Sequence, residues 1–207
     1  YDFSLSRSQM RVLNAEQSNL YLLRAPSGYA WSVDTQSLPS WITVSPTSGV
    51  GKTDITITVA EMTDADISTF ESRSGSYGSY VTKSYNGRRG EVVIRLDSKD
   101  YSTKMVVEQY DSDHYDGEVI VNQQATKGAG VNLVFMGDCF DAQDIADGEY
   151  IDGVNEAIGY YFAIEPYKSY RDYFNVYTVV GMSPDSGMGT VNTIKDAKFG
   201  SQYSLEG

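Results

Sequence analysis

Cysteine and histidine are almost absent from this sequence of 207 residues, which contains one of each. A single cysteine, Cys139, excludes an internal disulfide. A zinc hydrolase site normally uses several imidazole ligands, and His114 alone cannot supply a histidine pair. A cysteine nucleophile would need this same histidine as its base, so the simpler interpretation of Cys139 is a small buried residue after a strand.

Basic residues and long apolar runs are also scarce. Sixteen Lys and Arg face 28 Asp and Glu, which gives a formal net charge of −12. This charge repels phosphate backbones and anionic lipid surfaces, so we expect no nucleic-acid partner. No apolar run is long enough to span a bilayer, which predicts no transmembrane segment. The opening residues Tyr1-Asp2-Phe3 are unlike a signal peptide and indicate a trimmed or processed chain.

The first half of the sequence alternates between apolar and polar residues with a period of two. In residues 53–59, Ile55, Ile57 and Val59 share one face of the predicted strand, and polar residues occupy the other. Short strands of this kind, separated by turn residues, predict an antiparallel sandwich. The predicted strands cover residues 10–14, 20–24, 30–34, 41–45, 53–59, 90–96 and 101–109.

Several motifs in this half resemble those of the BACON domain. They are Trp31-Ser32-Val33, the run WITVSPTSG over 41–49, RGEVVI over 89–94 and Val107-Glu108-Gln109. The resemblance covers residues 1–110 and implies an immunoglobulin-like β-sandwich. It also implies a place in front of a secreted enzyme, in a family named for suspected carbohydrate binding. Two departures are the long stretch 62–87, expected to be an extended loop or an added hairpin, and Glu61-Met62 in place of a typical Asn.

The aromatic residues of the first half offer two alternative carbohydrate sites. Trp31 and Trp41 are candidate stacking platforms, but both lie in alternating strand patterns, which favours packing between the sheets. The tyrosine-rich insertion offers Tyr77, Tyr80 and Tyr85 as more exposed candidates. The alternative for these three residues is a solvated loop without a ligand.

The second half has a different pattern. An acidic linker over 111–117 and a short strand over 118–123 precede the apolar run 131–136, which predicts a strand buried on both faces. A helix is predicted from Asp141, whose carboxylate can cap the first turn, to Glu165, since Pro166 ends it. A further strand over 173–180 completes a strand–helix–strand unit of the α/β type.

The order of these segments resembles the front part of the IgA-peptidase-like zinc metallopeptidases, which are secreted bacterial proteases. The matching residues are the run 131–136, Gly137-Asp138, the helix ending at Glu165-Pro166-Tyr167, the strand 174–181 and Ser183-Pro184-Asp185-Ser186-Gly187. The family binds zinc through two His one helical turn apart, beside a Glu. The resemblance therefore implies that residues 111–207 form a partial catalytic domain, with zinc and a protein substrate bound only by a longer protein, whose metal-binding helix follows Gly207.

Three polar segments are candidate ligand sites. Asp111, Asp113, Asp116 and Glu118 could form a calcium site, although their spacing departs from the EF-hand loop, or a solvated linker. Asp138, Asp141, Asp144 and Asp147 surround the predicted start of the helix, and helix capping accounts for them. Gly137-Asp138-Cys139 occupies a position where phosphates bind in other proteins, but the surrounding acids oppose an anion.

These observations predict a multidomain α+β protein with an immunoglobulin-like sandwich over 1–110 and a partial α/β metallopeptidase-like domain over 111–207. The expected role is the N-terminal portion of a secreted zinc endopeptidase located outside the cytoplasm. We expect no catalytic, cofactor-binding or metal-binding residue in the chain itself. The alternatives are an extracellular module that binds carbohydrate, such as mucin, or protein, and a degenerate peptidase homologue that recognises protein without cleaving it.

Overall fold

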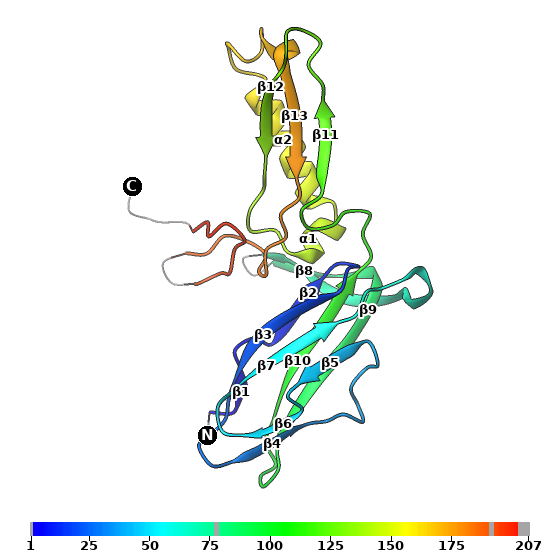
Figure 1. The fold of residues 1–207 in the computed structure, drawn as a ribbon, viewed down its shortest axis with the longest axis vertical. Helices are drawn as coiled ribbons and strands as arrows, with labels where there is room; N and C mark the ends of the chain where they lie inside the picture. The colour runs from blue at the N-terminus through cyan, green and yellow to red at the C-terminus, as the bar shows by residue number, and fades with distance from the viewer. Residues whose placement is uncertain (1, 77–78, 191–192, 203–207) are drawn as a thin grey trace. The chain divides into compact units, whose positions relative to one another are not determined.

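The computed structural model describes residues 2–76, 79–190 and 193–202. The chain is rich in β-structure, with 44% of residues in strands and 12% in helices. It divides into two compact units, Tyr1–Asp111 (unit 1) and Ser112–Gly207 (unit 2). Figure 1 shows the strands of unit 1 and the smaller sheet of unit 2, and each unit is described by itself.

Unit 1 consists of two sheets. The four-stranded sheet has the order β1-β3-β7-β5, and the six-stranded sheet has the order β2-β10-β9-β4-β6, with β8 paired to β9. Most pairs are antiparallel, but β2 runs parallel to β10. The strands are β1 Ser4–Leu5, β2 Gln9–Val12, β3 Gln17–Arg24, β4 Ala30–Val33, β5 Ile42–Ser45, β6 Ser48–Val50, β7 Thr53–Val59, β8 Ser68–Ser76, β9 Ser79–Leu96 and β10 Ser102–Tyr110, and a 3-10 helix, η1, covers Asp64–Asp66.

One hydrophobic core lies between these two sheets. Ile55, Ile57 and Val59 of β7 are fully buried, as the alternation predicted, and they join buried residues of β9 and β10 in a single cluster. Burial of each such side chain contributes about 1.5–3 kcal/mol relative to exposure. Trp31 belongs to this cluster, and its indole N–H donates to the carbonyl of Gly51 at 3.1 Å. The inward face of every strand in this core is therefore covered.

The long insertion 62–87 forms a hairpin. Strands β8 and β9 pair antiparallel from Ser68 opposite Gly87 to Ser76 opposite Ser79. An aromatic cluster anchors the base of the hairpin, where the rings of Phe70 and Tyr85 lie 5.3 and 5.1 Å from that of Tyr110. Gly87 has a φ of 140°, and a Cβ there would lie 2.0 Å from the carbonyl oxygen of Gln109, so no larger residue fits.

Unit 2 contains a three-stranded sheet in the order β11-β13-β12. Strand β13 (Phe174–Val179) pairs antiparallel with β11 (Val119–Gln123) and parallel with β12 (Val131–Phe135). Helices α1 (Ala142–Ala146) and α2 (Glu149–Tyr161) connect β12 to β13, followed by a 3-10 helix, η2 (Arg171–Tyr173). Within the described residues, no helix has both the length and the apolar character needed to cross a membrane.

Strand β12 corrects the expectation of a strand buried on both faces. It lies at the edge of the sheet, and Val131 and Val134 are both exposed. Helix α2 covers one face only, where Phe135 meets the ring of Tyr161 at 5.8 Å. The central strand β13 carries the fully buried residues of this sheet, Val176 and Thr178. An apolar run thus marks the strand but does not reveal which of its faces is covered.

The predicted single helix is two helices. Asp141 caps α1 by accepting from the backbone N–H groups of Gln143 and Asp144, which confirms the predicted start. The chain then breaks at Gly148, whose φ of 82° lies in the left-handed region. Helix α2 ends at Tyr161, before the predicted end at Glu165, and turns follow up to Pro166 and beyond. Its buried residues Tyr150, Val154 and Ile158 recur every four positions.

Candidate functional site at the ends of strands β12 and β13

Strands β12 and β13 are parallel, so the loops after them lie at the same end of the sheet, where α/β proteins usually place their sites. The two loops are hydrogen-bonded to each other: Ser183 N–H donates to the carbonyl of Phe140 and Gly187 N–H to that of Cys139, both at 2.7 Å. The hydroxyl of Tyr150 on α2 accepts from Gly137 N–H at 2.9 Å and donates to the carbonyl of Val179 at 2.6 Å. The loops are therefore fixed to the helix and to one another.

Asp138 is the principal charged group of this network. Its carboxylate accepts backbone N–H groups from Cys139 at 2.9 Å, Phe199 at 3.2 Å and Ser201 at 3.0 Å. Burial raises the pKa of Asp138, but hydrogen bonds from the hydroxyl and N–H of Ser201 and from the other two N–H groups outweigh burial and lower the pKa to about 2. The carboxylate stays ionised and holds residues 199–201 against the loop after β12.

Ser183 connects the two loops to the same carboxylate. Its hydroxyl is buried, donates to Asp138 at 3.1 Å and accepts the N–H groups of Cys139 at 3.0 Å and Lys198 at 3.1 Å. These bonds hold Cys139 at a φ of 68°, a left-handed conformation that is uncommon for a residue with a side chain. Ser183 acts here as a bridge between backbone N–H groups and the Asp138 carboxylate.

Cys139 lacks the properties of a catalytic thiol. It is buried, and burial followed by the charge of Asp138 raises the pKa of its thiol, which therefore stays protonated at neutral pH. Its sulfur lies 3.9 Å from the carbonyl oxygen of Ser201. The ring Nδ1 of His114 lies 2.8 Å from the carboxylate of Glu118, so the single histidine is engaged in a pair of its own.

Asp141 and Asp144 form a buried carboxyl pair at the start of α1. Asp141 N–H donates to the Asp144 carboxylate at 2.9 Å, and the Asp141 carboxylate accepts from Asp144 N–H at 3.1 Å. Burial, then the charge of Asp141, raises the pKa of Asp144 to about 6, against hydrogen bonds from Asp141 N–H and the Ser186 hydroxyl. The predicted capping role is confirmed for Asp141 and Asp144, whereas Asp138 binds the N–H groups of the loops instead.

The acidic linker does not gather around one point. Asp111 accepts from the side chain of Asn14 at 2.8 Å, Asp116 pairs with Lys198 and accepts Met182 N–H, and Asp113 is exposed. Across residues 2–76, 79–190 and 193–202, no three His, Cys, Asp or Glu side chains are placed to hold one metal ion. The calcium interpretation of this segment gains no structural support.

The carbohydrate candidates of unit 1 are mostly covered. Trp31 is fully buried, and Trp41 is half-buried beneath the guanidinium of Arg88, 4.6 Å from its ring centroid. Tyr85 is buried, which corrects its expected exposure, because it packs edge-on against Tyr110. Tyr77 lies outside the described residues. Tyr80 is exposed and lies beneath Arg73, so the insertion presents one described ring of the predicted three.

Sequence reasoning missed the uncovered face of the sheet in unit 2. The side chains of Val119 and Val121 on β11, Val134 on β12 and Met136 just beyond it are 60%, 54%, 48% and 55% exposed. The register places Val119 beside Val179, and both Val121 and Val134 beside Tyr177, so these residues line the face opposite α2. We call these six residues the open sheet face. The available signal was that apolar residues occupy consecutive positions in 119–121 and 134–136, and therefore both faces of each strand.

No protein-family model matches the sequence, and no curated protein matches it. Among solved structures, the chain is similar to a GH5 xyloglucanase of Bacteroides ovatus in complex with a XXXG heptasaccharide, with a TM-score of 0.37 and 17% identity over 60% of this chain. The chain spans 24% of that protein's length. It is also similar to WR4, a C. elegans member of the MSP family, with a TM-score of 0.30 and 11% identity over 52% of this chain and 95% of WR4. Likeness this low carries no argument about function.

Proposed function

We propose that this chain is the N-terminal, non-catalytic portion of a secreted zinc endopeptidase similar to the IgA-peptidase-like family. In this proposal, unit 1 is an immunoglobulin-like spacer related to the BACON domain, and unit 2 is the supporting part of the catalytic domain. The observation that carries the proposal is the open sheet face, an apolar surface on the side of the sheet opposite α2. The motif resemblance over 131–187 supplies the family.

The open sheet face is unusually apolar for a surface in contact with solvent. Polar side chains normally occupy the solvent side of a sheet, and contiguous apolar patches mark sites that another polypeptide covers. Covering each half-exposed valine would contribute about 1 kcal/mol. Within the described residues, β11 and β12 pair only with β13, so each also offers a backbone edge to a further strand. Both features fit a surface that further parts of a catalytic domain complete.

The residues of this chain do not fit a zinc site. The sequence has one His, which pairs with Glu118, and no metal-holding group of three occurs among the residues that the structure describes. We therefore assign no step of peptide hydrolysis to this chain. Its proposed contribution is positional: the network of Asp138, Ser183 and Ser201 fixes the loop 183–187, which in the proposal borders the substrate cleft.

The test uses the natural gene product in place of residues 1–207. We expect its sequence to continue past Gly207 into a helix with the pattern H-E-x-x-H, and the purified protein to contain about one zinc ion and cleave an unfolded protein substrate. Chelation should abolish cleavage, and residues 1–207 should have no activity with added zinc. A gene product without this pattern, or a zinc-free protein that still cleaves, would contradict the proposal.

For unit 1, burial of Trp31 favours the spacer over a tryptophan-based sugar site. The alternative function, an extracellular module that binds carbohydrate or protein without catalysis, keeps Tyr80 as its exposed candidate in this unit. Titration of the chain with mucin-type and plant polysaccharides separates the two roles. Binding that is lost in Tyr80→Ala would favour the binding module over the spacer.

A further inference from the structure

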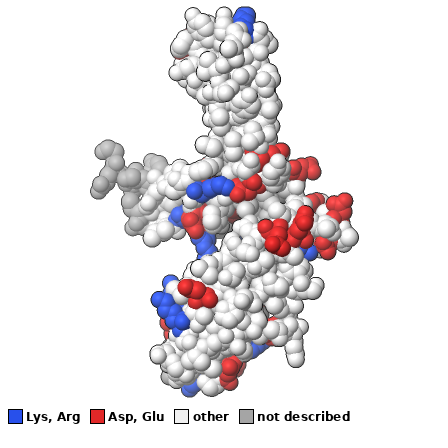
Figure 2. Space-filling view, viewed as in Figure 1, with Lys and Arg blue, Asp and Glu red and all other residues white. Residues whose placement is uncertain are grey.

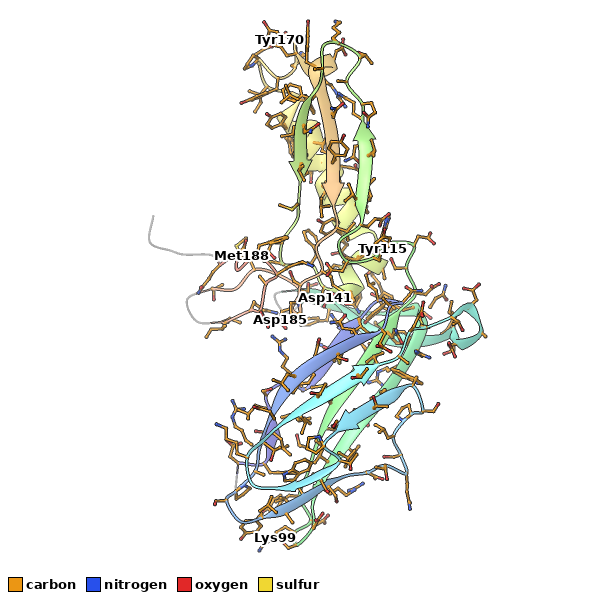
Figure 3. All side chains as sticks on the ribbon, viewed as in Figure 1. Lys99, Tyr115, Asp141, Tyr170, Asp185 and Met188 are labelled. Atoms are coloured by element: carbon orange, nitrogen blue, oxygen red, sulfur yellow. The ribbon has the colours of Figure 1, made fainter. Side chains whose placement is uncertain are left out.

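Exposed tyrosines occur at the end of α2 and in the segment that follows it, and the proposed function gives their side chains no role. Tyr160 is at the end of α2, and Tyr167, Tyr170 and Tyr173 follow in the turns and the 3-10 helix before β13. They are 66%, 38%, 55% and 41% exposed. We call these four residues the tyrosine surface. Figure 3 labels Tyr170 in this segment, with other side chains projecting around it.

Two of the four rings, those of Tyr167 and Tyr173, pack against neighbouring residues of unit 2. Tyr167 stacks on Tyr161 with ring centroids 4.2 Å apart and an angle of 30° between the ring planes. Tyr161 is itself edge-on to Phe135 and Phe162. Tyr173 lies close above Gly128, where a Cβ would be 3.3 Å from the ring. A surface fixed in this way loses little conformational entropy when a ligand binds.

Charged side chains of both signs lie near the tyrosines, and most are paired, although Lys168, between Tyr167 and Tyr170 in the sequence, is exposed. Lys127 Nζ lies 2.9 Å from the Asp172 carboxylate, and the Arg171 guanidinium donates to Gln123 Oε1 at 2.9 Å while lying 4.8 Å from the ring centroid of Phe162. On the face seen in Figure 2, the end of unit 2 that carries Tyr170 is almost entirely uncharged. The positive charges of this segment, Lys168 and Arg171 with nearby Lys127, are balanced by Glu156, Glu165 and Asp172, so the surface offers ring faces with little net charge. The hydroxyl of Tyr160 is already bonded to Glu156 at 2.9 Å.

We propose that the tyrosine surface binds a neutral glycan. A sugar ring presents C–H groups with partial positive charge on one face, which the negative face of an aromatic ring attracts, and hydroxyls at its edge, which phenols can hydrogen-bond. Nucleic acid is disfavoured by the net charge of −12. A polypeptide partner fits the open sheet face better, since that surface is built from four valines, a methionine and a single tyrosine, Tyr177.

This inference does not depend on the peptidase proposal. The tyrosine surface uses side chains of α2, η2 and the turns between them, whereas the peptidase proposal rests on the open sheet face, the motif resemblance over 131–187 and sequence beyond this chain. A result that contradicts the peptidase proposal would not contradict glycan binding by the tyrosine surface, and the reverse also holds. A secreted protein with a spacer and a sugar-binding surface would be held near glycan-coated substrates.

The test measures binding of residues 1–207 to neutral polysaccharides by affinity electrophoresis and calorimetry. The probes are xyloglucan, mixed-linkage β-glucan, galactomannan and desialylated mucin. We expect retardation by at least one probe, insensitive to salt, and a loss of about tenfold in affinity for Tyr170→Ala and for Tyr173→Ala. Tyr170→Phe, which keeps the ring, should lose less than Tyr170→Ala.

The matched controls are Tyr101→Ala in unit 1 and Tyr115→Ala in unit 2, which remove similarly exposed tyrosines elsewhere. Thermal unfolding of each variant checks that the fold is kept, and the singly substituted Tyr170→Phe serves if an alanine variant fails to fold. Four results would overturn the proposal: no probe binds, the control variants lose as much affinity, binding falls steeply with salt, or the tyrosine variants lose binding to a protein and not to a glycan.

Discussion

Strand β7 of unit 1 alternates between apolar and polar residues, whereas strands β11 and β12 of unit 2 carry apolar residues on both faces, and the two units cover these residues differently. In unit 1, two sheets face one another, and Ile57 of β7 and Ile94 of β9 are both fully buried in the same core. In unit 2, α2 covers one face of a three-stranded sheet, and Val121 and Val134 remain exposed on the other. The apolar faces of the sheets are thus covered in unit 1, whereas one face of the sheet in unit 2 is exposed. This exposed face is where we expect a partner to bind.

The largest effect should come from truncating the covered core. Ile57→Ala should lower the free energy of unfolding of unit 1 by about 2–5 kcal/mol, because it removes buried methylenes and leaves a cavity. Val121→Ala on the open sheet face should cost less than about 0.5 kcal/mol in the same chain. Urea unfolding of both variants measures the contrast, and equal losses would mean that the open sheet face is covered in solution.

The next effect concerns the carboxylate that fixes the loops of unit 2. Asp138→Asn should destabilise unit 2 by about 1–3 kcal/mol, because an amide is a weaker acceptor for the three N–H groups. The folded pKa of Asp138, about 2, lies below its ordinary value of 3.8. Its contribution is therefore present above pH 3.8 and is lost as the pH falls toward 2. Unfolding measured from pH 5 to 2 should lose this dependence in Asp138→Asn, and an unchanged profile would contradict the assigned role.

Asp144 should show the opposite pH dependence. Its folded pKa of about 6 lies above its ordinary value of 3.8, so the folded state binds the proton more tightly and unit 2 loses stability as the pH rises from 3.8 to 6. Asp144→Asn should remove this loss and stabilise unit 2 at pH 7 by on the order of 1 kcal/mol. The check is unfolding at pH 4 and pH 7 for both proteins; a variant that is less stable at pH 7 would show that the charge supports the cap more than burial opposes it.

The smallest effect on stability is expected for a charged substitution on the open sheet face. Val134→Lys should leave unfolding of the 207-residue chain within about 0.5 kcal/mol and reduce binding of a hydrophobic dye, because it places a charge on the open sheet face. Leu20→Lys is the matched control, since Leu20 is exposed on β3 of unit 1. If both variants reduce dye binding equally, the open sheet face binds the dye no better than the surface around a single exposed leucine.

The sequence was sufficient where one physical requirement decides the structure. Alternation over 53–59 placed Ile55, Ile57 and Val59 correctly, because a strand exposes its two faces differently, and Asp141 marked the helix start, because its carboxylate can accept the first N–H groups. Tertiary packing decided the rest. The run 131–136 does not reveal that only one face of β12 meets a helix, and the burial of Tyr85 depends on hairpin pairing and on Tyr110.

The helix boundary and the site show the same limit. Pro166 ends a helix only if one reaches it, and here α2 ended earlier at Tyr161. The Asp147-Gly148 pair did carry a signal for the break after α1. The Asp138 network depends on Ser183 and Ser201, which lie 45 and 63 residues further along the chain, so no local pattern predicts it.

Hydrogen–deuterium exchange of β11 and β12 tests the central claim most directly, when residues 1–207 are compared with the natural gene product. If further polypeptide covers the open sheet face, the amides of 119–123 and 131–135 should exchange more slowly in the longer protein, whereas those of 53–59 in unit 1 should not change. Equal exchange of 119–123 and 131–135 in the two proteins would show that this face is not covered by further chain and would contradict the account.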